Sequence, residues 1–175
     1  MLPSGEGWAV GGEYTDTGQQ SIVLHYSRGS WTAQETGMPA QLNAAFALSP
    51  TEVWAVGTKD IAVGPGVILH YVGGKWSAVT SPTPNLLHTV VMRSATDGWI
   101  GGDGAAILRY DGHASTKDAL VIHGYQIISL AIAGSGASVE GWGVGAYQAA
   151  PTDGPLMLHY SHGSWSQYHV PLFAA

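Results

Sequence analysis

The sequence contains no cysteine and few charged residues. Without cysteine, the chain forms no disulfide bonds, carries no thiolate nucleophile and offers no thiolate ligand for zinc. Charged residues make up 10% of the 175 residues, whereas an average soluble domain has about 25%. Few solvated helix faces are therefore expected, although the length is enough for one domain with a hydrophobic core.

Clusters of basic residues, an acidic tail and long apolar runs are also absent. The six lysines and arginines are dispersed, which excludes the electrostatic footprint of a nucleic-acid-binding protein. No apolar run is long enough to span a membrane. The N-terminal stretch Met-Leu-Pro-Ser-Gly-Glu lacks the basic and apolar regions of a signal peptide. Cysteine content leaves the compartment open, because many secreted bacterial proteins lack it, and an extracellular or cell-surface bacterial location is favoured.

Glycine and proline are abundant, and they occur at short intervals along the whole chain. The 25 glycines and 9 prolines are spread evenly rather than gathered in one linker. This distribution is typical of short strands joined by frequent turns.

A tryptophan recurs about every 45 residues within one short phrase. The phrase first reads Gly-Trp-Ala-Val-Gly, and its tryptophans are Trp8, Trp54, Trp99 and Trp142. A second phrase, Leu-His-Tyr or Leu-Arg-Tyr, ends at Tyr26, Tyr71, Tyr110 and Tyr160. Five residues later stands Trp31, Trp76, Ser115 or Trp165. A repeat of this length, rich in short apolar runs, is typical of β-propeller blades.

Each repeat predicts four strands, named A to D in chain order. Strand A is expected at 42–48, 86–92 and 127–133, strand B carries the tryptophan phrase and strand C the tyrosine phrase. Strand D starts near the second tryptophan, after a short glycine-containing hairpin. The repeat units are 4–41, 42–85, 86–126 and 127–171 of a single domain 1–175, and the first unit lacks strand A. The predicted fold is all-β, a β-propeller of about four blades; a β-solenoid or a sandwich is the alternative.

How the ring closes is left open by the sequence. The chain could be part of a longer propeller, a compact four-bladed ring, or one half of a homodimer that completes a larger ring. An open half-ring would expose apolar blade faces, so association is expected in that case.

The two phrases resemble known propeller repeats. Ser/acid-Gly-Trp-x-Val-Gly followed by Ile-Leu-x-Tyr-x-x-Gly-x-Trp resembles the bacterial repeats grouped with photosystem II assembly-factor-like and sialidase-type (BNR) propellers. The sialidase-type repeat has an aspartate in the turn before the second tryptophan, and the turn before Trp76 has none. An acid instead precedes strand B, at Glu6, Glu52, Asp97 and Glu140. These acids are interpreted as turn formers that accept backbone N–H bonds.

The links between strands B and C predict the ligand-binding face. They vary in length, covering 12–20, 58–66, 102–105 and 146–155, and each carries an acid. The candidate ligand-binding residues are Glu13, Tyr14, Asp16, Asp60, Asp103, Tyr147 and Asp153. One acid per blade around a shared rim could bind calcium or a polar ligand such as a glycan. The alternative is that these are ordinary solvated loops, in which acids are common; no other cofactor or metal is predicted.

The recurring aromatic and histidine residues predict packing rather than chemistry. His25, His70 and His159 precede the strand-C tyrosine, and strand C is distant from the propeller axis. They therefore fan outward and cannot converge on one metal ion. The tyrosines and the second tryptophans are expected between blades, with a carbohydrate-stacking platform as the alternative.

Enzyme signatures are weak in this sequence. A sialidase-like hydrolase would need clustered arginines, whereas Arg28, Arg93 and Arg109 belong to a hairpin, a strand A and a strand C. Neither a nucleophile elbow nor a phosphate-binding loop is present. The sequence predicts a non-catalytic scaffold that binds a protein or a glycan. The alternatives are a fragment of a secreted sialidase-like glycan-processing enzyme and a structural repeat of a larger surface protein.

Overall fold

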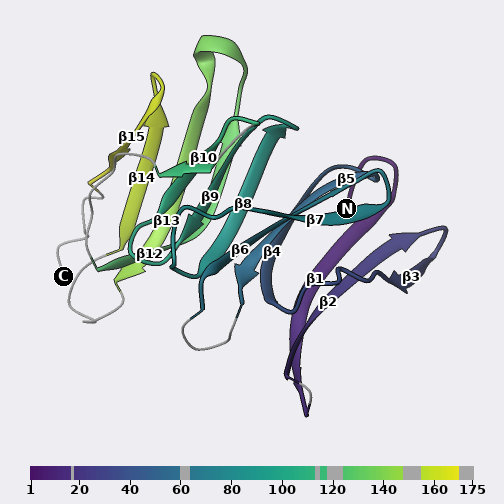
Figure 1. Cartoon of the computed structure of the whole chain (residues 1–175). Helices are drawn as coiled ribbons and strands as arrows, with labels where there is room; N and C mark the ends of the chain where they lie inside the picture. Colours follow the sequence, from purple (N-terminus) through teal and green to yellow (C-terminus); the bar gives the residue numbers. More distant parts are fainter. Residues whose placement is uncertain (17, 60–63, 113–114, 118–123, 148–154, 170–175) are drawn as a thin grey trace, which may run out of the picture.

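Four antiparallel β-sheets stand side by side in the computed structural model of the chain (Figure 1). The structure describes residues 1–16, 18–59, 64–112, 115–117, 124–147 and 155–169. Strands dominate these residues, with one short 3₁₀ turn at Gly136–Ser138. None of the described segments is a helix long and apolar enough to cross a bilayer. The predicted all-β class is confirmed.

The strands follow one another within each sheet in chain order. The first sheet has three strands, β1 (Gly7–Thr15), β2 (Gly18–Ser27) and β3 (Ser30–Ala33). The second contains β4 (Gln41–Ser49), β5 (Glu52–Thr58), β6 (Gly66–Val72) and β7 (Lys75–Val79). The third contains β8 (Leu87–Ser94), β9 (Asp97–Gly102), β10 (Ile107–Tyr110) and β11 (Ser115–Lys117). The fourth contains β12 (Tyr125–Ala133), β13 (Glu140–Tyr147), β14 (Leu156–Ser161) and β15 (Ser164–Gln167). As predicted, the first sheet lacks strand A, so β1 is its strand B.

The C–D hairpins close with two residues that both have positive φ. Arg28 and Gly29 have φ of 51° and 83°, and His162 and Gly163 have φ of 51° and 85°. This is the type I′ turn, whose twist matches the twist of the strands it joins. The turn also fixes the register, in which each strand-C tyrosine faces the residue five positions later. Tyr110 faces Ser115 in the same way, so β11 keeps the register without a tryptophan.

A β-bulge near the start of every strand A explains the last glycine of the tryptophan phrase. The ladder skips one residue at Asn43, His88 and Ile128. Opposite the bulge, a Cβ on Gly57 would overlap the carbonyl oxygen of Gln41. Gly102 and Gly145 meet Leu86 and Gln126 in the same way. Only glycine leaves room for this close backbone approach.

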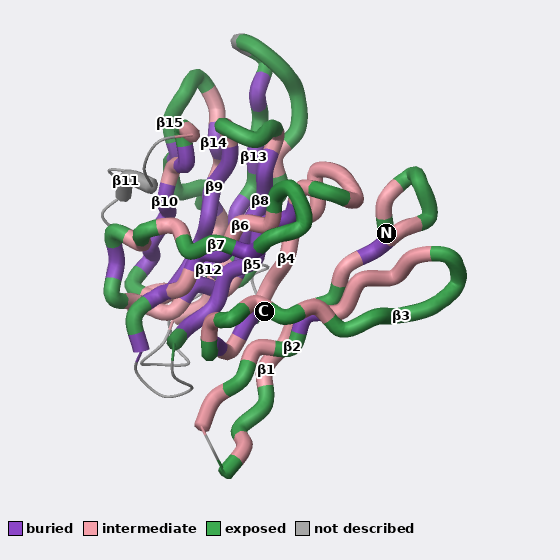
Figure 2. Tube along the Cα trace, turned by 45° about the vertical axis from the view of Figure 1, so that its right-hand side comes forward, coloured by how far each residue is buried: buried purple, intermediate pink, exposed green. Residues whose placement is uncertain are grey.

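Three hydrophobic cores lie between successive sheets. In each core the strand-B tryptophan contacts the strand-C tyrosine of the following sheet, with ring centroids 4.9 Å apart for Trp8–Tyr71, 4.5 Å for Trp54–Tyr110 and 4.9 Å for Trp99–Tyr160. Figure 2 shows the buried residues concentrated in the second to fourth sheets, while the first is mostly exposed or intermediate. The first strands of the sheets contact one another in series, β1 with β4, β4 with β8 and β8 with β12. They therefore form the inner edge of the arc.

Candidate ligand-binding face

The B–C and D–A connections emerge at one edge of the four sheets, the lower edge in Figure 1. Every second connection of an antiparallel sheet with this strand order lies at the same edge, so loops distant in sequence are brought together there. The bulges at Asn43, His88 and Ile128, near the start of each strand A, lie at this edge as well. Bulges re-aim side chains, and they often occur beside functional sites.

A histidine–aspartate pair occupies this edge in the third sheet. The bulge residue His88 points its Nε2 at Oδ1 of Asp103, 2.6 Å away, and both side chains are about three-quarters buried. The Nδ2 of Asn85 donates to the Asp103 carbonyl oxygen at 3.0 Å, and the Asp103 N–H donates to Leu86 at 2.9 Å. Asp103, in the B–C loop, is therefore held by Asn85 and Leu86, which precede strand A, and by His88 within strand A.

The same loop is tied to the fourth sheet. Ala105, which has a φ of 53°, donates its N–H to the Tyr125 carbonyl oxygen at 2.6 Å. The ring of Tyr125 packs edge-on against Tyr147, with centroids 5.0 Å apart. Asp103 and Tyr147, two residues predicted for the site, are thus linked through Ala105 and Tyr125. Asn43 makes the corresponding link from the second sheet, because its Nδ2 donates to the Leu87 carbonyl oxygen at 2.8 Å.

The other predicted site residues are more dispersed. Glu13 and Tyr14 were expected in a loop spanning 12–20, but they lie in β1, which pairs with β2 as far as Thr15 and Gly18. Apart from Gly7 and Val23, no residue of β1 or β2 is buried, so polar residues are tolerated in these strands and do not mark a loop. Asp16 is exposed at the hairpin tip. Asp60 and Asp153 lie outside the described residues.

The acids do not form a cation-binding group in the part of the chain that the structure describes. No three His, Asp or Glu side chains gather there in a way that could hold a metal ion. Calcium normally takes six to eight oxygen ligands, so a single aspartate such as Asp103 paired to a histidine does not supply a site.

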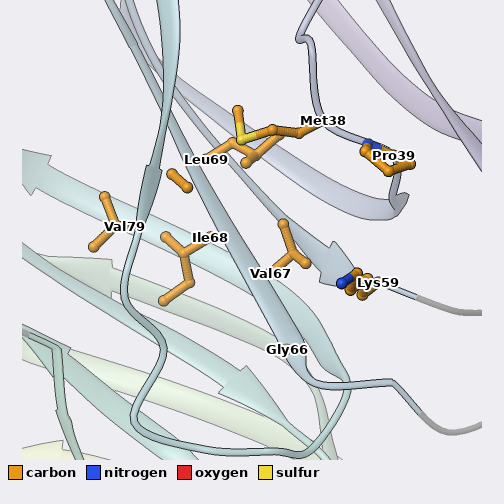
Figure 3. Close-up of a pocket in the computed structure, with 9 residues that line it drawn as sticks. Met38, Pro39, Lys59, Gly66, Val67, Ile68, Leu69 and Val79 are labelled. Carbon is orange, nitrogen blue, oxygen red and sulfur yellow. The ribbon is translucent and has the colours of Figure 1, made fainter.

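A cavity opens at this edge between the D–A link that follows the first sheet and strands β6 and β7 of the second sheet (Figure 3). It has a volume of about 250 Å³. Figure 3 shows Met38 and Pro39 of the D–A link lying over Val67 and the Lys59 amine. The walls are apolar and Lys59 supplies the one charged group among the lining residues. This cavity could not be predicted from the sequence because its walls come from two repeats.

A second hollow adjoins the first. It has a volume of about 310 Å³ and shares Met38 and Pro39 with the apolar cavity. Its other walls are polar, formed by Gln19, Gln20, Ser21, Glu35, Thr36 and Gly37. The link before β4 is anchored here, since the Ser21 hydroxyl donates to the Met38 carbonyl oxygen at 2.6 Å. An apolar and a polar hollow thus lie on either side of one short segment.

The opposite edge of the sheets carries a repeated acid–base–aromatic stack. In the second sheet, Oε1 of Glu52 lies 3.2 Å from Nε2 of His70, whose ring stacks on Trp54 at 4.0 Å. The first and fourth sheets repeat this arrangement with Glu6, His25 and Trp8 and with Glu140, His159 and Trp142. The acids were interpreted as turn formers for backbone N–H groups; instead they pair with the strand-C base.

The third sheet builds the same stack from different residues. Arg109 pairs with Asp97, and its guanidinium carbon lies 4.1 Å from the centroid of the Trp99 ring. A shorter acid is thus combined with a longer base, and the cation covers the tryptophan as a histidine ring does elsewhere. Nearby, burial raises the pKa of Tyr110, and the negative charges of Asp111 and Glu52 raise it further. Tyr110 therefore enters the core as a neutral phenol.

The contribution of each acid–histidine pair to the free energy of unfolding is expected to be larger where the pair is more buried. Glu52→Ala should cost about 1 kcal/mol of unfolding free energy, whereas Glu140→Ala should cost at most about 0.5 kcal/mol. The physical reason is solvent screening, because the side chain of Glu52 is 24% exposed and that of Glu140 is 53% exposed. Urea unfolding followed by tryptophan fluorescence measures both, and equal costs would contradict this explanation.

The arrangement of sheets is similar to that of a solved β-propeller. The chain matches YCF48 from Cyanidioschyzon merolae with a TM-score of 0.60 and 15% sequence identity. The match covers 87% of this chain and 51% of that chain, so the chain spans about half the length of the protein it matches. No family model and no curated protein matches the sequence. At this identity the comparison shows the fold, and it confirms four propeller blades side by side.

Proposed function

We propose that the chain is a non-catalytic propeller scaffold that binds a protein segment at the edge where the B–C and D–A connections meet. The observation that carries this proposal is the pair of adjoining hollows, one apolar and one polar, on either side of Met38 and Pro39. Their volumes, about 250 and 310 Å³, lie just below and at the lower end of the roughly 300–1,000 Å³ of ligand pockets, which suits side chains of an extended segment.

The chemistry of the walls defines the preferred ligand. Met38, Val67 and Val79 offer apolar contact, and methionine adapts its shape to different occupants. The Lys59 amine at the same cavity favours a carboxylate on the ligand. The proposed ligand is therefore a protein segment that presents a large apolar side chain next to an aspartate or glutamate.

A hydrolytic function has less support at this edge. His88 is hydrogen-bonded to Asp103, and within the described residues no serine or threonine hydroxyl is hydrogen-bonded to the His88 ring. A nucleophile and its base normally lie within hydrogen-bond reach of each other. The geometry of His88 and Asp103 instead suits a rigid support for the loop.

Selection of displayed random peptides on the immobilised chain tests the proposed function. The enriched peptides are expected to combine a large apolar residue with an adjacent acid. Lys59→Glu should weaken their binding about tenfold, equivalent to about 1.4 kcal/mol. The matched control is Lys75→Glu, because Lys75 is an exposed lysine in a C–D hairpin at the other edge.

Three outcomes would overturn this proposal. Binding that is equally sensitive to Lys59→Glu and Lys75→Glu would be nonspecific attraction between charges. Binding to a glycan array without peptide enrichment would favour a carbohydrate ligand, and turnover of chromogenic glycosides would favour an enzyme fragment.

A further inference from the structure

The three internal blade junctions share one aromatic template. The strand-B tryptophan of one sheet receives the strand-C tyrosine of the next, and a strand-D tryptophan adds to it in the first junction, where Trp8 and Trp76 lie 6.0 Å apart. Burial at these junctions is deep, since Trp54 and Trp99 are 0% exposed and Trp76 is 5% exposed. Each sheet therefore has a donor face, with the tyrosine, and a receptor face, with the strand-B tryptophan.

The donor face of the first sheet has no partner among the described residues. Tyr26 and Trp31 pack on each other at 5.2 Å, the same separation as Tyr71 and Trp76 in the second sheet. Trp31 is nevertheless 49% exposed, and Ile22 on β2 is 37% exposed. The aromatic pair is thus assembled as in an internal junction but left uncovered.

The receptor face of the fourth sheet is uncovered in the same way. Trp142 is 41% exposed and Val144 is 44% exposed, whereas their counterparts Trp54 and Val56 are 0% exposed. Tyr168, which follows β15, contacts Trp142 with a centroid separation of 5.2 Å. This single ring covers only part of the face, because Trp142 and Val144 stay 41% and 44% exposed beside it.

The two uncovered faces are complementary. Of the large exposed hydrophobic side chains in the described residues, only Val72 belongs to the second or third sheet. Figure 1 shows the first and fourth sheets at opposite ends of the row, so one chain does not bring its own faces together. Contiguous exposed apolar surface of this kind marks an interaction site.

We propose that the receptor face of one chain, at Trp142 and Val144, binds the donor face of a second copy, at Tyr26 and Trp31. The three internal junctions show that this pairing of faces is stable in this repeat. The match to YCF48 pairs 87% of this chain with 51% of that propeller chain, so one copy spans only part of a propeller chain of that length. Two chains then associate head to tail with two equivalent junctions. This inference does not depend on the proposed peptide-binding edge.

Complementation between two charged variants tests the head-to-tail geometry. The unaltered chain is expected to have twice its 18.2 kDa mass by light scattering during size-exclusion chromatography. Trp31→Glu and Trp142→Glu should each give single chains. In a pair made of two copies of the same variant, both junctions would contain a substituted face. A 1:1 mixture should regain a two-chain species, because the intact receptor face of Trp31→Glu meets the intact donor face of Trp142→Glu. Both tryptophans are about half exposed, so circular dichroism of the variants should be unchanged.

Val72→Glu is the matched control, because Val72 is 52% exposed in a sheet whose two faces are already covered. It should leave the two-chain mass unchanged. A single-chain mass for the unaltered chain would overturn the proposal and assign Tyr168 as a sufficient cap, or other blades as the cover. A two-chain mass that neither variant alters, or a mixture that stays single-chain, would also overturn it. Peptide binding is expected to change with Lys59→Glu and to stay the same with Trp31→Glu or Trp142→Glu. The experiments can therefore contradict either proposal without contradicting the other.

Discussion

Gly57→Ala is expected to destabilise the chain by at least about 3 kcal/mol, at the upper end for overpacking. The added Cβ would overlap the carbonyl oxygen and carbon of Gln41, which are backbone atoms of the neighbouring strand. A flexible side chain could move aside, but this backbone is held by the bulge and by its ladder with β5. Urea or thermal unfolding measures the loss, and the protein is expected to be at least partly unfolded at 37 °C.

The repeat supplies its own control for this prediction. Gly11 occupies the same position of the tryptophan phrase in the first sheet, where strand A is missing, and a Cβ there would meet no atom within 4 Å. Gly11→Ala should therefore change stability by no more than about 0.5 kcal/mol. Equal losses at Gly11 and Gly57 would show that the glycine is needed for backbone conformation rather than for the close approach of strand A.

Trp54→Ala should cost about 3–5 kcal/mol, the range for removing a buried aromatic side chain. Trp54 is 0% exposed, its ring stacks on His70, and it packs against Tyr110 of the third sheet. The substitution therefore opens a cavity at a junction between two blades. Total stability of a domain is about 5–15 kcal/mol, so the loss should be visible as a large shift of the urea midpoint.

Tyr14→Ala is the control for the tryptophan, because Tyr14 is 70% exposed on the first hairpin. Its cost should stay within about 0.5 kcal/mol. A Trp54→Ala variant as stable as Tyr14→Ala would contradict the assignment of the strand-B tryptophan to the core between blades.

Most of the strand pattern could be predicted from the sequence because it depends on neighbouring residues. The glycine-containing turns before Trp76 and Trp165 set the register of strands C and D, and the positive φ values of these turns are a local property. The missing strand A was also predictable, since no apolar segment precedes Trp8. The glycine that ends the tryptophan phrase was also visible in the sequence, but the reason for it, the close approach of Gly57 to Gln41 beside the bulge, is seen only in the sheet.

The edge of the molecule that carries the proposed function could not be predicted to the same depth. Asp103 was predicted for it, but its partner His88 precedes it by fifteen residues and faces it only because a bulge turns that side chain toward the loop. Solvent-exposed strands such as β1 near Glu13 have the polarity of loops, so their extent depends on the ladder with β2.

The repeat, the order of strands and the three-stranded first sheet could be predicted from the sequence alone, because each follows from residues close together in the chain. The histidine–acid pairs, the cavity beside Met38 and the exposed tryptophans of the first and fourth sheets depend on the packing of sheets and loops that are distant in sequence. Glu6 and His25 are nineteen residues apart, and Met38 and Val67, which line one cavity, come from two repeats. Trp54 and Trp142 stand in closely similar phrases, yet one is buried and the other exposed, because burial depends on whether another sheet lies against it.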